Sequence, residues 1–371
     1  MLDFIRIACA VPAVKVGDVY KNAEDICRFM EQADAQDVDL LVLPELALTG
    51  YTCGDLFYQD MLYRAVATGL ARILECSAEH SDLTVAVGLP VRLGGKLYNC
   101  AAVISGGEVD GLVAKTHIPG AEKRWFTSGR ELDGEAIGYE ELGLTGSGEL
   151  IPIGTGELFR VGDAVVGVEI CQDLLAPIPV SSHLAVHGAE VIVNLSASPE
   201  IAGKSAYRRD LVRHQSQACN CIYAYVSAGR TESTTDQVFC GQSLVGENGR
   251  ILAERSGRPE TDYLLVTDCD LGRIRADRLR NPCFDYAFGG AVQASCRSDG
   301  SLYPLRKLPF IPDQKLVRQQ RCNEIFDIQV AGLKQRLATI GANAVIGNAW
   351  AAATRKIQAP TIIMIDFLKS Y

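Results

Sequence analysis

The sequence predicts a layered α/β fold, and three observations support this. Short apolar runs rich in β-branched residues recur along residues 1–310, and such runs are typical of strands. Polar segments with helical or turn character separate them, which favours strands and helices that alternate along the chain. The runs are continuous rather than alternating in polarity, and this indicates sheets covered on both faces.

The expected strands lie at residues 5–10, 40–43, 83–89, 97–105, 165–171, 191–198, 222–227 and 263–268. A helix between the first two is expected from the spacing of Ala23, Ile26, Cys27, Met30 and Ala33. The chain therefore opens as a strand, helix, strand unit. Residues 238–254 are predicted to form a β-hairpin, because the Asn248-Gly249 step suits a tight turn. Antiparallel pairing then joins the parallel units and adds α+β character.

Three segments are expected along the chain: a domain at residues 1–310, a linker with the start of a second domain at 311–347, and a divergent tail at 348–371. The boundary is placed where the sequence becomes extended and Pro-containing, at residues 302–314. Beyond it, one helical face is marked by Phe326, Val330, Leu333 and Leu337. Residues 342–347 resemble a further strand.

Composition narrows the class of partner. The 36 Lys and Arg residues against 45 Asp and Glu residues give a net charge of -9, which argues against nucleic acid held through its phosphates and favours a small molecule. The start of the chain lacks the order of a secretory signal, and no run of about 18 apolar residues is present, so we expect a cytoplasmic protein without a membrane partner. The thirteen cysteines are scattered through apolar segments, as reduced core residues are.

Three strand-like runs end beside a reactive side chain. Glu45 follows "LLVLP", Lys115 follows "GLVA" and Cys171 follows "VVGVEI". Because ligands collect beyond the carboxyl ends of strands in open α/β sheets, the three side chains are expected to converge. Together they supply a base, an oxyanion stabiliser and a nucleophile for attack on a carbonyl. Taken singly, each has a simpler explanation as a core thiol, a solvated ammonium or a helix N-terminal charge.

The segments around these residues resemble a known family. "LVLPELALTGY", "AKTHIP" and "GVEICQDL" are similar to the three signatures of the nitrilase, or carbon–nitrogen hydrolase, superfamily. Residues 193–212, 234–254 and 321–337 resemble, more narrowly, the glutaminase domain of the glutamine-dependent NAD synthetase family and the helix that follows it. This resemblance implies a four-layer α-β-β-α sandwich whose cysteine releases ammonia from glutamine, for amidation of adenylated deamido-NAD at a synthetase site.

The resemblance also implies roles for individual residues. Cys171 would attack the glutamine amide to give a thioester, Glu45 would move the protons, and Lys115 would lower the thiol pKa and meet the oxyanion together with the backbone N–H of Gln172. Glu122 is the candidate for the second glutamate that many superfamily members place beside the lysine. Its alternative is an exposed charge in "GAEKRWF".

Substrate binding is assigned in the same way, to Tyr51, Gln172, Ser198 and Lys204. Ser198 with the proline after it also suits an ordinary turn. Lys204, with Arg208 and Arg209, could instead serve subunit contacts or form a solvated helical face. No metal is expected.

The chain departs from the family in two places. Gln172 and "DLLAP" stand where family members commonly carry an acidic residue and a tryptophan. After "NAVIG" the family continues with a Ser-Gly-rich loop for ATP, whereas here 24 residues remain, too few for a nucleotide-binding domain. We therefore expect a truncated chain without cofactors of its own, since ATP and deamido-NAD need a complete synthetase domain. The apolar run at 359–368 is expected to fold poorly, and deletion of 348–371 to raise solubility.

Three functions stay open at this point. The leading one is glutamine amidohydrolysis, and the second is hydrolysis of another small amide. The third is a silent scaffold that pairs with full-length synthetase subunits. Homo-oligomeric assembly is expected in each case.

Overall fold

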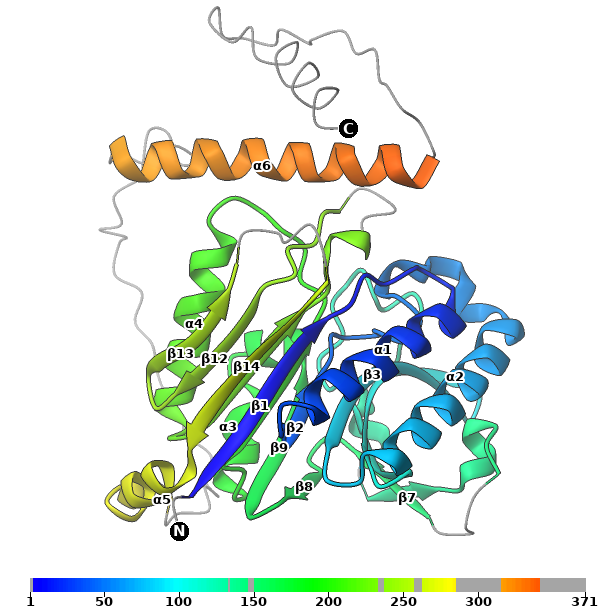
Figure 1. Cartoon of the computed structure of the whole chain (residues 1–371), viewed down its shortest axis with the longest axis horizontal. Coiled ribbons are helices and arrows are strands. Elements are labelled where there is room, and N and C mark those ends of the chain that lie inside the picture. Colours follow the sequence, from blue (N-terminus) through cyan, green and yellow to red (C-terminus); the bar gives the residue numbers. More distant parts are fainter. Residues whose placement is uncertain are drawn as a thin grey trace, which may run out of the picture.

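The computed structural model describes residues 3–132, 134–145, 150–232, 237–256, 262–284 and 315–340. In these residues two β-sheets pack face to face and helices cover both outer faces, which gives four layers in the order α-β-β-α (Figure 1). The layered α/β prediction is confirmed. The expected linker at 302–314, the strand at 342–347 and the tail at 348–371 lie outside the described residues.

The first sheet has eight strands in the order β14-β1-β2-β3-β4-β5-β7-β6. Their bounds are β1 Phe4–Val11, β2 Leu40–Val42, β3 Thr84–Leu93, β4 Lys96–Ser105, β5 Glu108–Ala114, β6 Glu135–Ile137, β7 Ile151–Gly154 and β14 Tyr263–Asp270. β1, β2 and β3 are parallel, and β3, β4 and β5 form an antiparallel meander. β2 and β5 therefore point the same way, and their carboxyl ends lie at one edge of the sheet.

The second sheet has six strands in the order β13-β12-β11-β10-β9-β8. Their bounds are β8 Leu158–Val161, β9 Ala164–Ile170, β10 Val191–Ser196, β11 Ile222–Ser227, β12 Ser243–Glu247 and β13 Arg250–Arg255. β9, β10 and β11 are parallel. β12 and β13 form the predicted hairpin, and Asn248 and Gly249 at its turn both have positive φ, 43° and 83°.

The outer layers are helical. The helices are α1 Val19–Asp34, α2 Asp60–Glu79, α3 Val180–Val186, α4 Lys204–Ala218, α5 Leu271–Leu279 and α6 Lys315–Ile340. Short 3₁₀ turns are η1 Tyr51–Tyr58, η2 Gly129–Leu132, η3 Tyr139–Leu142, η4 Cys171–Leu175, η5 Arg230–Glu232 and η6 Pro282–Phe284. α1 and α2 cover the eight-stranded sheet, and α3 and α4 cover the other (Figure 1).

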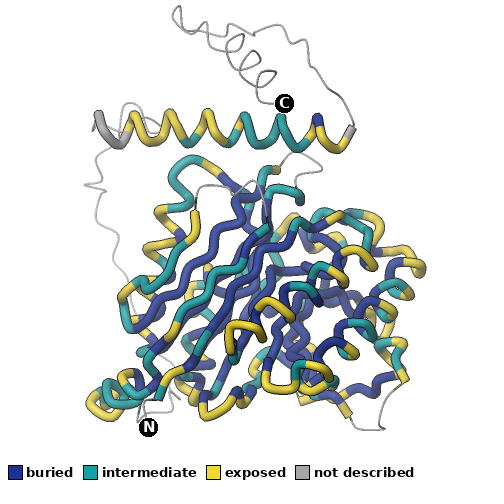
Figure 2. The backbone as a smooth tube through the Cα atoms, viewed as in Figure 1, coloured by how far each residue is buried: buried dark blue, intermediate teal, exposed yellow. Residues whose placement is uncertain are grey.

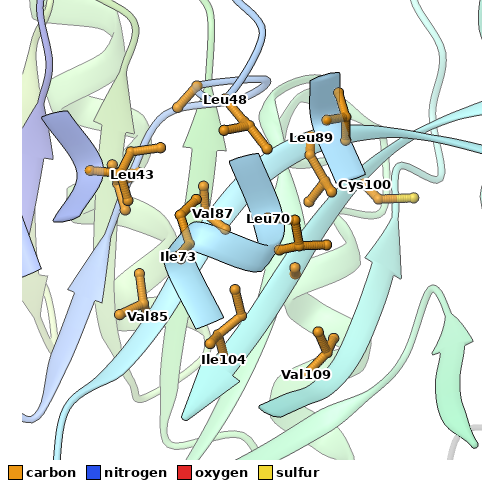
Figure 3. Packing of buried hydrophobic residues seen from close by; sticks show 14 of the residues in the cluster. Leu43, Leu48, Leu70, Ile73, Val85, Val87, Leu89, Cys100, Ile104 and Val109 are labelled. Carbon is orange, nitrogen blue, oxygen red and sulfur yellow. The ribbon is translucent and has the colours of Figure 1, made fainter. Parts of the chain in front are cut away.

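Each interface between layers holds its own apolar core. Figure 3 shows Leu70 and Ile73 of α2 lying over Val85 and Val87 of β3, as the helical and strand periodicities require. A second core fills the space between the two sheets, and a third lies under α3 and α4. Burial on both faces explains why the strand sequences are continuously apolar, and Figure 2 shows the strands as the most buried part of the chain.

The predicted strands and the helix α1 are all present. Three strands were not foreseen, β6, β7 and β8, because each has only three or four residues and no long apolar run. The predicted helical face beyond the linker lies on α6, where Leu337 is buried while Phe326 is exposed. Hydrogen bonds link α6 to the sandwich, among them one from the Gly203 N–H to Glu324 and one from Gln335 to the Thr231 carbonyl.

None of the helices in the described ranges combines the length and the apolar character that crossing a bilayer requires.

Candidate active site

Glu45 lies on the loop that follows β2, at the edge where the two sheets meet. Gly88 on β3 makes this position possible, because a Cβ there would lie 2.2 Å from the Leu46 nitrogen and 2.6 Å from the Pro44 carbonyl oxygen. The Glu45 N–H donates to the Ser196 carbonyl at the end of β10, 3.3 Å away. The loop is therefore held between a strand of each sheet, and its carboxylate is buried.

Lys115 follows β5 and is fully buried. Its ammonium donates to Glu45 Oε1 at 2.5 Å and to both carboxylate oxygens of Glu122 at 2.8 Å. Burial lowers the pKa of Lys115, but the negative charges around it, with Glu45 the strongest, outweigh burial and hold the pKa above its usual value. The solvated-lysine alternative is thus wrong, and the side chain is a buried cation between two carboxylates.

Glu122 is buried rather than exposed, so the alternative reading of it is also wrong. Its Oε1 accepts from Lys115 and from the Tyr51 hydroxyl, the latter at 2.9 Å. Burial raises the pKa of Glu122, the charge of Glu45 raises it further, and the bonds from Lys115 and Tyr51 offset part of the rise. Glu122 thereby holds the Lys115 ammonium together with Glu45.

Asn99 is a site residue that the sequence analysis missed. It is buried on β4, and its amide donates to Glu45 Oε1 at 2.7 Å. Glu45 Oε1 therefore receives two hydrogen bonds, whereas Oε2 has no partner among the described residues. A polar side chain inside the apolar run 97–105 was the available signal. The unpartnered Oε2 is the carboxylate oxygen that remains able to accept a proton.

Cys171 begins η4 directly after β9, one residue beyond the strand end. Its φ of 46° lies in the left-handed region, which costs a residue other than glycine about 1 kcal/mol or more. Burial raises the pKa of its thiol to about 12, and Glu45 and Glu122 add to the rise, while Lys115 and a hydrogen bond with Ser196 lower it. Lys115 does lower the pKa of Cys171, as expected, but burial has the larger effect, so the net shift of the pKa is upward.

Asp173 joins the loop after Lys115 to the turn at Cys171, and it too was missed. Its carboxylate accepts from the His117 N–H at 2.7 Å, the Thr116 N–H at 3.3 Å and the Ile170 N–H at 3.1 Å. Burial raises the pKa of Asp173 to about 7, and the backbone donors of His117 and Ile170 oppose the rise. Because the carboxylate bridges the two loops, it sets where the thiol lies relative to the lysine.

Of the four predicted substrate residues, Tyr51 is hydrogen-bonded to Glu122, and Lys204 lies near enough to Cys171 for their charges to interact. The Tyr51 ring packs edge-on against Phe239 with 5.7 Å between ring centroids, and Ser198 is buried in the segment that follows β10. Lys204, at the start of α4, is half-buried and donates to the Pro199 carbonyl at 2.8 Å. Burial lowers the pKa of Lys204, and the neighbouring charge of Arg208 lowers it further.

Gln172 differs from these three. Its side chain lines a hollow of about 580 Å³ together with residues 116–120, and the lining contains neither Tyr51 nor Ser198 nor Lys204. Gln172 is thus placed beside the loop that follows Lys115. A larger hollow of about 1020 Å³, between α2 and the β3–β4 hairpin, contains none of the predicted site residues.

Arg208 corrects the idea of a solvated helical face on α4. It is buried, pairs with Glu200 at 2.5 Å and donates to Gln242 at 2.7 Å. Arg209, one residue on, is exposed as expected and pairs with Glu254. The face that contains Lys204 and Arg208 is therefore turned into the protein.

Comparison with known sequences gives one family and a consistent set of relatives. The family model for carbon-nitrogen hydrolase matches residues 6–279. Glutamine-dependent NAD(+) synthetase of Mycobacterium leprae is 35% identical over 354 residues, which cover 91% of this chain and 51% of that protein. The enzyme of the same name from Aquifex aeolicus is 30% identical over 268 residues, covering 71% and 42%. The chain spans about half the length of the curated relatives it matches.

Solved structures agree with the fold. A glutamine-dependent NAD(+) synthetase from Cytophaga hutchinsonii superimposes with a TM-score of 0.59 at 30% identity, covering 71% of this chain and 43% of that one. An amidase of the nitrilase superfamily from Nesterenkonia AN1 gives 0.60 at 21% identity, covering 76% and 98%. The second similarity shows a shared architecture, the nitrilase-type four-layer sandwich that the sequence predicts.

Proposed function

This chain belongs to the carbon–nitrogen hydrolase family, and from that premise we propose that it hydrolyses the side-chain amide of glutamine to glutamate and ammonia. One observation supports the chemistry above the others: a buried lysine held between two carboxylates, with a thiol at the adjoining strand end. The substrate is proposed from the relatives that are named glutamine-dependent.

The first step of the proposed mechanism starts from a neutral thiol, because the pKa of Cys171 is about 12. Glu45 Oε2, the oxygen without a partner among the described residues, takes the proton as the sulfur attacks the amide carbon. The carbonyl oxygen becomes an oxyanion, which Lys115 and the backbone N–H of Gln172 stabilise. For this, one Lys115 N–H turns from Glu122 towards the oxyanion.

The second half of the reaction returns the proton. The proton on Glu45 passes to the departing nitrogen, the C–N bond breaks, ammonia leaves, and a glutamyl thioester remains on Cys171. Glu45 then takes a proton from water, whose oxygen attacks the thioester carbon. As the C–S bond breaks, this proton passes from Glu45 to the sulfur, which gives glutamate, the free thiol and the Glu45 carboxylate. Throughout, Glu122 keeps the ammonium of Lys115 in place.

We further propose that the ammonia serves the amidation of deamido-NAD, as the names of the relatives suggest. ATP and deamido-NAD would then be ligands of a synthetase domain and not of the site around Cys171. Tyr51, Ser198 and Lys204 are proposed to hold the amino-acid end of glutamine. Cytoplasmic location and homo-oligomeric assembly stay predictions.

Ammonia release by the purified chain tests the proposal. Glutamine, asparagine and butyramide are compared at pH 8, with Cys171→Ala as the control. Release from glutamine in preference to the others, and its loss in the variant, is the expected result. Release from a simple amide but not from glutamine would replace glutamine by another substrate, and no release from folded protein would favour the silent scaffold.

A further inference from the structure

A third buried glutamate, Glu232, lies near enough to Glu45 to feel its charge and takes no part in the mechanism above. Glu232, in η5, is fully buried, and burial raises the pKa of its carboxyl, to which the charge of Glu45 adds. A buried carboxylate is expensive unless donors surround it, so its partners indicate why it is there. No residue of the three family signatures lies near it in sequence.

Among the described residues, the donors to the Glu232 carboxylate come from the first two residues of η1. Glu232 Oε1 accepts from the Tyr51 N–H at 2.8 Å, and Oε2 accepts from the Thr52 N–H at 3.1 Å and from the Thr52 hydroxyl at 3.0 Å. The same hydroxyl lies 2.7 Å from the Glu232 carbonyl oxygen, so its single proton is shared between these two acceptors. Two backbone N–H groups and one hydroxyl thus tie η1 to a residue about 180 positions later in the chain.

Tyr51 is the residue through which this contact reaches the centre. Its hydroxyl donates to Glu122 Oε1 at 2.9 Å, and Glu122 in turn holds the Lys115 ammonium through both oxygens. The backbone of Tyr51 is fixed at one end by Glu232 and its hydroxyl is used at the other. Glu232 is therefore connected to Lys115 through the covalent frame of Tyr51 and the hydrogen bonds of Glu122.

We propose that Glu232 is a positioning residue for the Cys171 centre, which holds the Tyr51 hydroxyl on Glu122 and so keeps Lys115 in register with the reacting amide. The proposal rests on the proposed amide hydrolysis for its kinetic consequence. Glu232→Gln is the direct variant, because one carboxylate oxygen becomes an NH₂ group that faces a backbone N–H donor. The loss of one hydrogen bond to a charged group predicts a fall in kcat of about tenfold.

A double-mutant cycle separates positioning from a general loss of structure. Tyr51→Phe removes the hydroxyl that Glu232 is proposed to position. If Glu232 acts through that hydroxyl, Glu232→Gln lowers kcat about tenfold in the wild-type chain and hardly at all in the Tyr51→Phe chain. If Glu232→Gln instead lowered kcat by the same factor in the Tyr51→Phe chain as in the wild-type chain, the proposal would be overturned. Should Glu232→Gln fail to fold, Thr52→Val takes its place, with an expected fall of about threefold and the same loss of effect beside Tyr51→Phe.

Glu247 provides the matched control. It is also buried, and its Oε2 accepts a backbone N–H, that of Asp270, at 2.8 Å, but its partners lie at the β12–β14 end of the molecule. Glu247→Gln should lower the unfolding temperature and leave kcat within about twofold of the wild type. An equal fall in kcat in Glu247→Gln and Glu232→Gln would show that any buried carboxylate matters alike, and the proposal would be wrong.

A readout without substrate keeps this test separate from that of the proposed function. The rate at which iodoacetamide alkylates Cys171 reports its thiol, whose pKa responds to Lys115 and Glu122, and peptide mapping identifies the cysteine. Glu232→Gln should change this rate in the wild-type chain and leave it unchanged beside Tyr51→Phe. If the wild type releases no ammonia from glutamine, the proposed function fails, yet the alkylation cycle still supports or overturns the role of Glu232.

Discussion

Removing the Lys115 ammonium should destabilise the fold strongly, although the side chain replaced is matched in length. Lys115→Met leaves the carboxylates of Glu45 and Glu122 facing each other in a buried site, without the three hydrogen bonds that now link them. Each hydrogen bond between charged groups stabilises the fold by about 1.5–3 kcal/mol. The variant offsets part of this loss because it no longer has to bury the ammonium. Removal of one partner of a buried ion pair typically costs about 3–5 kcal/mol, which is the predicted loss in free energy of unfolding at pH 8.

The loss should depend on pH in a definite direction. Burial and Glu45 already raise the pKa of Glu122 above its ordinary 4.5, and Lys115 is one of the groups that oppose the rise. In Lys115→Met the pKa rises further, so the folded state binds a proton that the unfolded chain has released. Stability therefore falls as pH increases above about 4.5, and the deficit of the variant is smaller at pH 5 than at pH 8.

Urea unfolding followed by circular dichroism at pH 5 and pH 8 measures this. Lys115→Met is compared with the triple variant Lys115→Met, Glu45→Gln, Glu122→Gln, in which no buried charge is left alone. Replacing a whole buried ion cluster is often nearly neutral, so the triple variant should regain most of the lost stability. A single variant within about 1 kcal/mol of the wild type at pH 8, or a triple variant less stable than the single one, would refute the reasoning.

Three further predictions concern the same region. Glu45→Gln removes a charge that raises the pKa of Cys171, so alkylation of that thiol by iodoacetamide at pH 8 should quicken while ammonia release falls by about 100-fold or more; slower alkylation would contradict this. The pKa of Asp173 is about 7, against an ordinary 3.8. The free energy of unfolding of the wild type, measured in urea, should therefore fall by about 4 kcal/mol relative to that of Asp173→Asn as pH rises from 4 to 7.5. A difference between the two that does not depend on pH would exclude the shift. Gly88→Ala places a Cβ against the backbone of the Glu45 loop and should cost about 1–3 kcal/mol together with most of the activity, whereas Gly156→Ala, which meets nothing within 4 Å, should change neither the unfolding temperature nor the rate.

The sequence was sufficient to predict the layers and the convergence of Glu45, Lys115 and Cys171. Both follow from local patterns: apolar runs of strand length, and a reactive side chain directly after three of them. Glu122 could be named as a candidate, but its burial could not be decided. It stands seven positions after Lys115 in a loop, and nothing in "GAEKRWF" shows which side chain turns inward. Its burial is settled by the two bonds to the ammonium.

The remaining residues could not be predicted because their partners are distant in sequence. Asn99 meets Glu45 across 54 positions, Asp173 meets His117 across 56, and Glu232 meets Tyr51 across 181. Only a polar residue in a buried strand, as at Asn99, leaves a sign in the sequence. For the net pKa of Cys171 the sequence was misleading, because charge near the thiol was visible and the larger effect of burial was not.

The residues of the candidate active site come from both sheets, so the packing between the sheets affects the geometry of the site. Glu45 and Lys115 follow strands of the eight-stranded sheet, while Cys171 follows a strand of the other. The distance between Glu45 and Cys171 therefore depends on the size of the side chains packed between the two sheets, among them Val42, Val113 and Val168. Removing a methyl group from that core should bring the two sheets closer together. Because attack tolerates little misplacement of the reacting atoms, the turnover rate should then report the distance between the sheets.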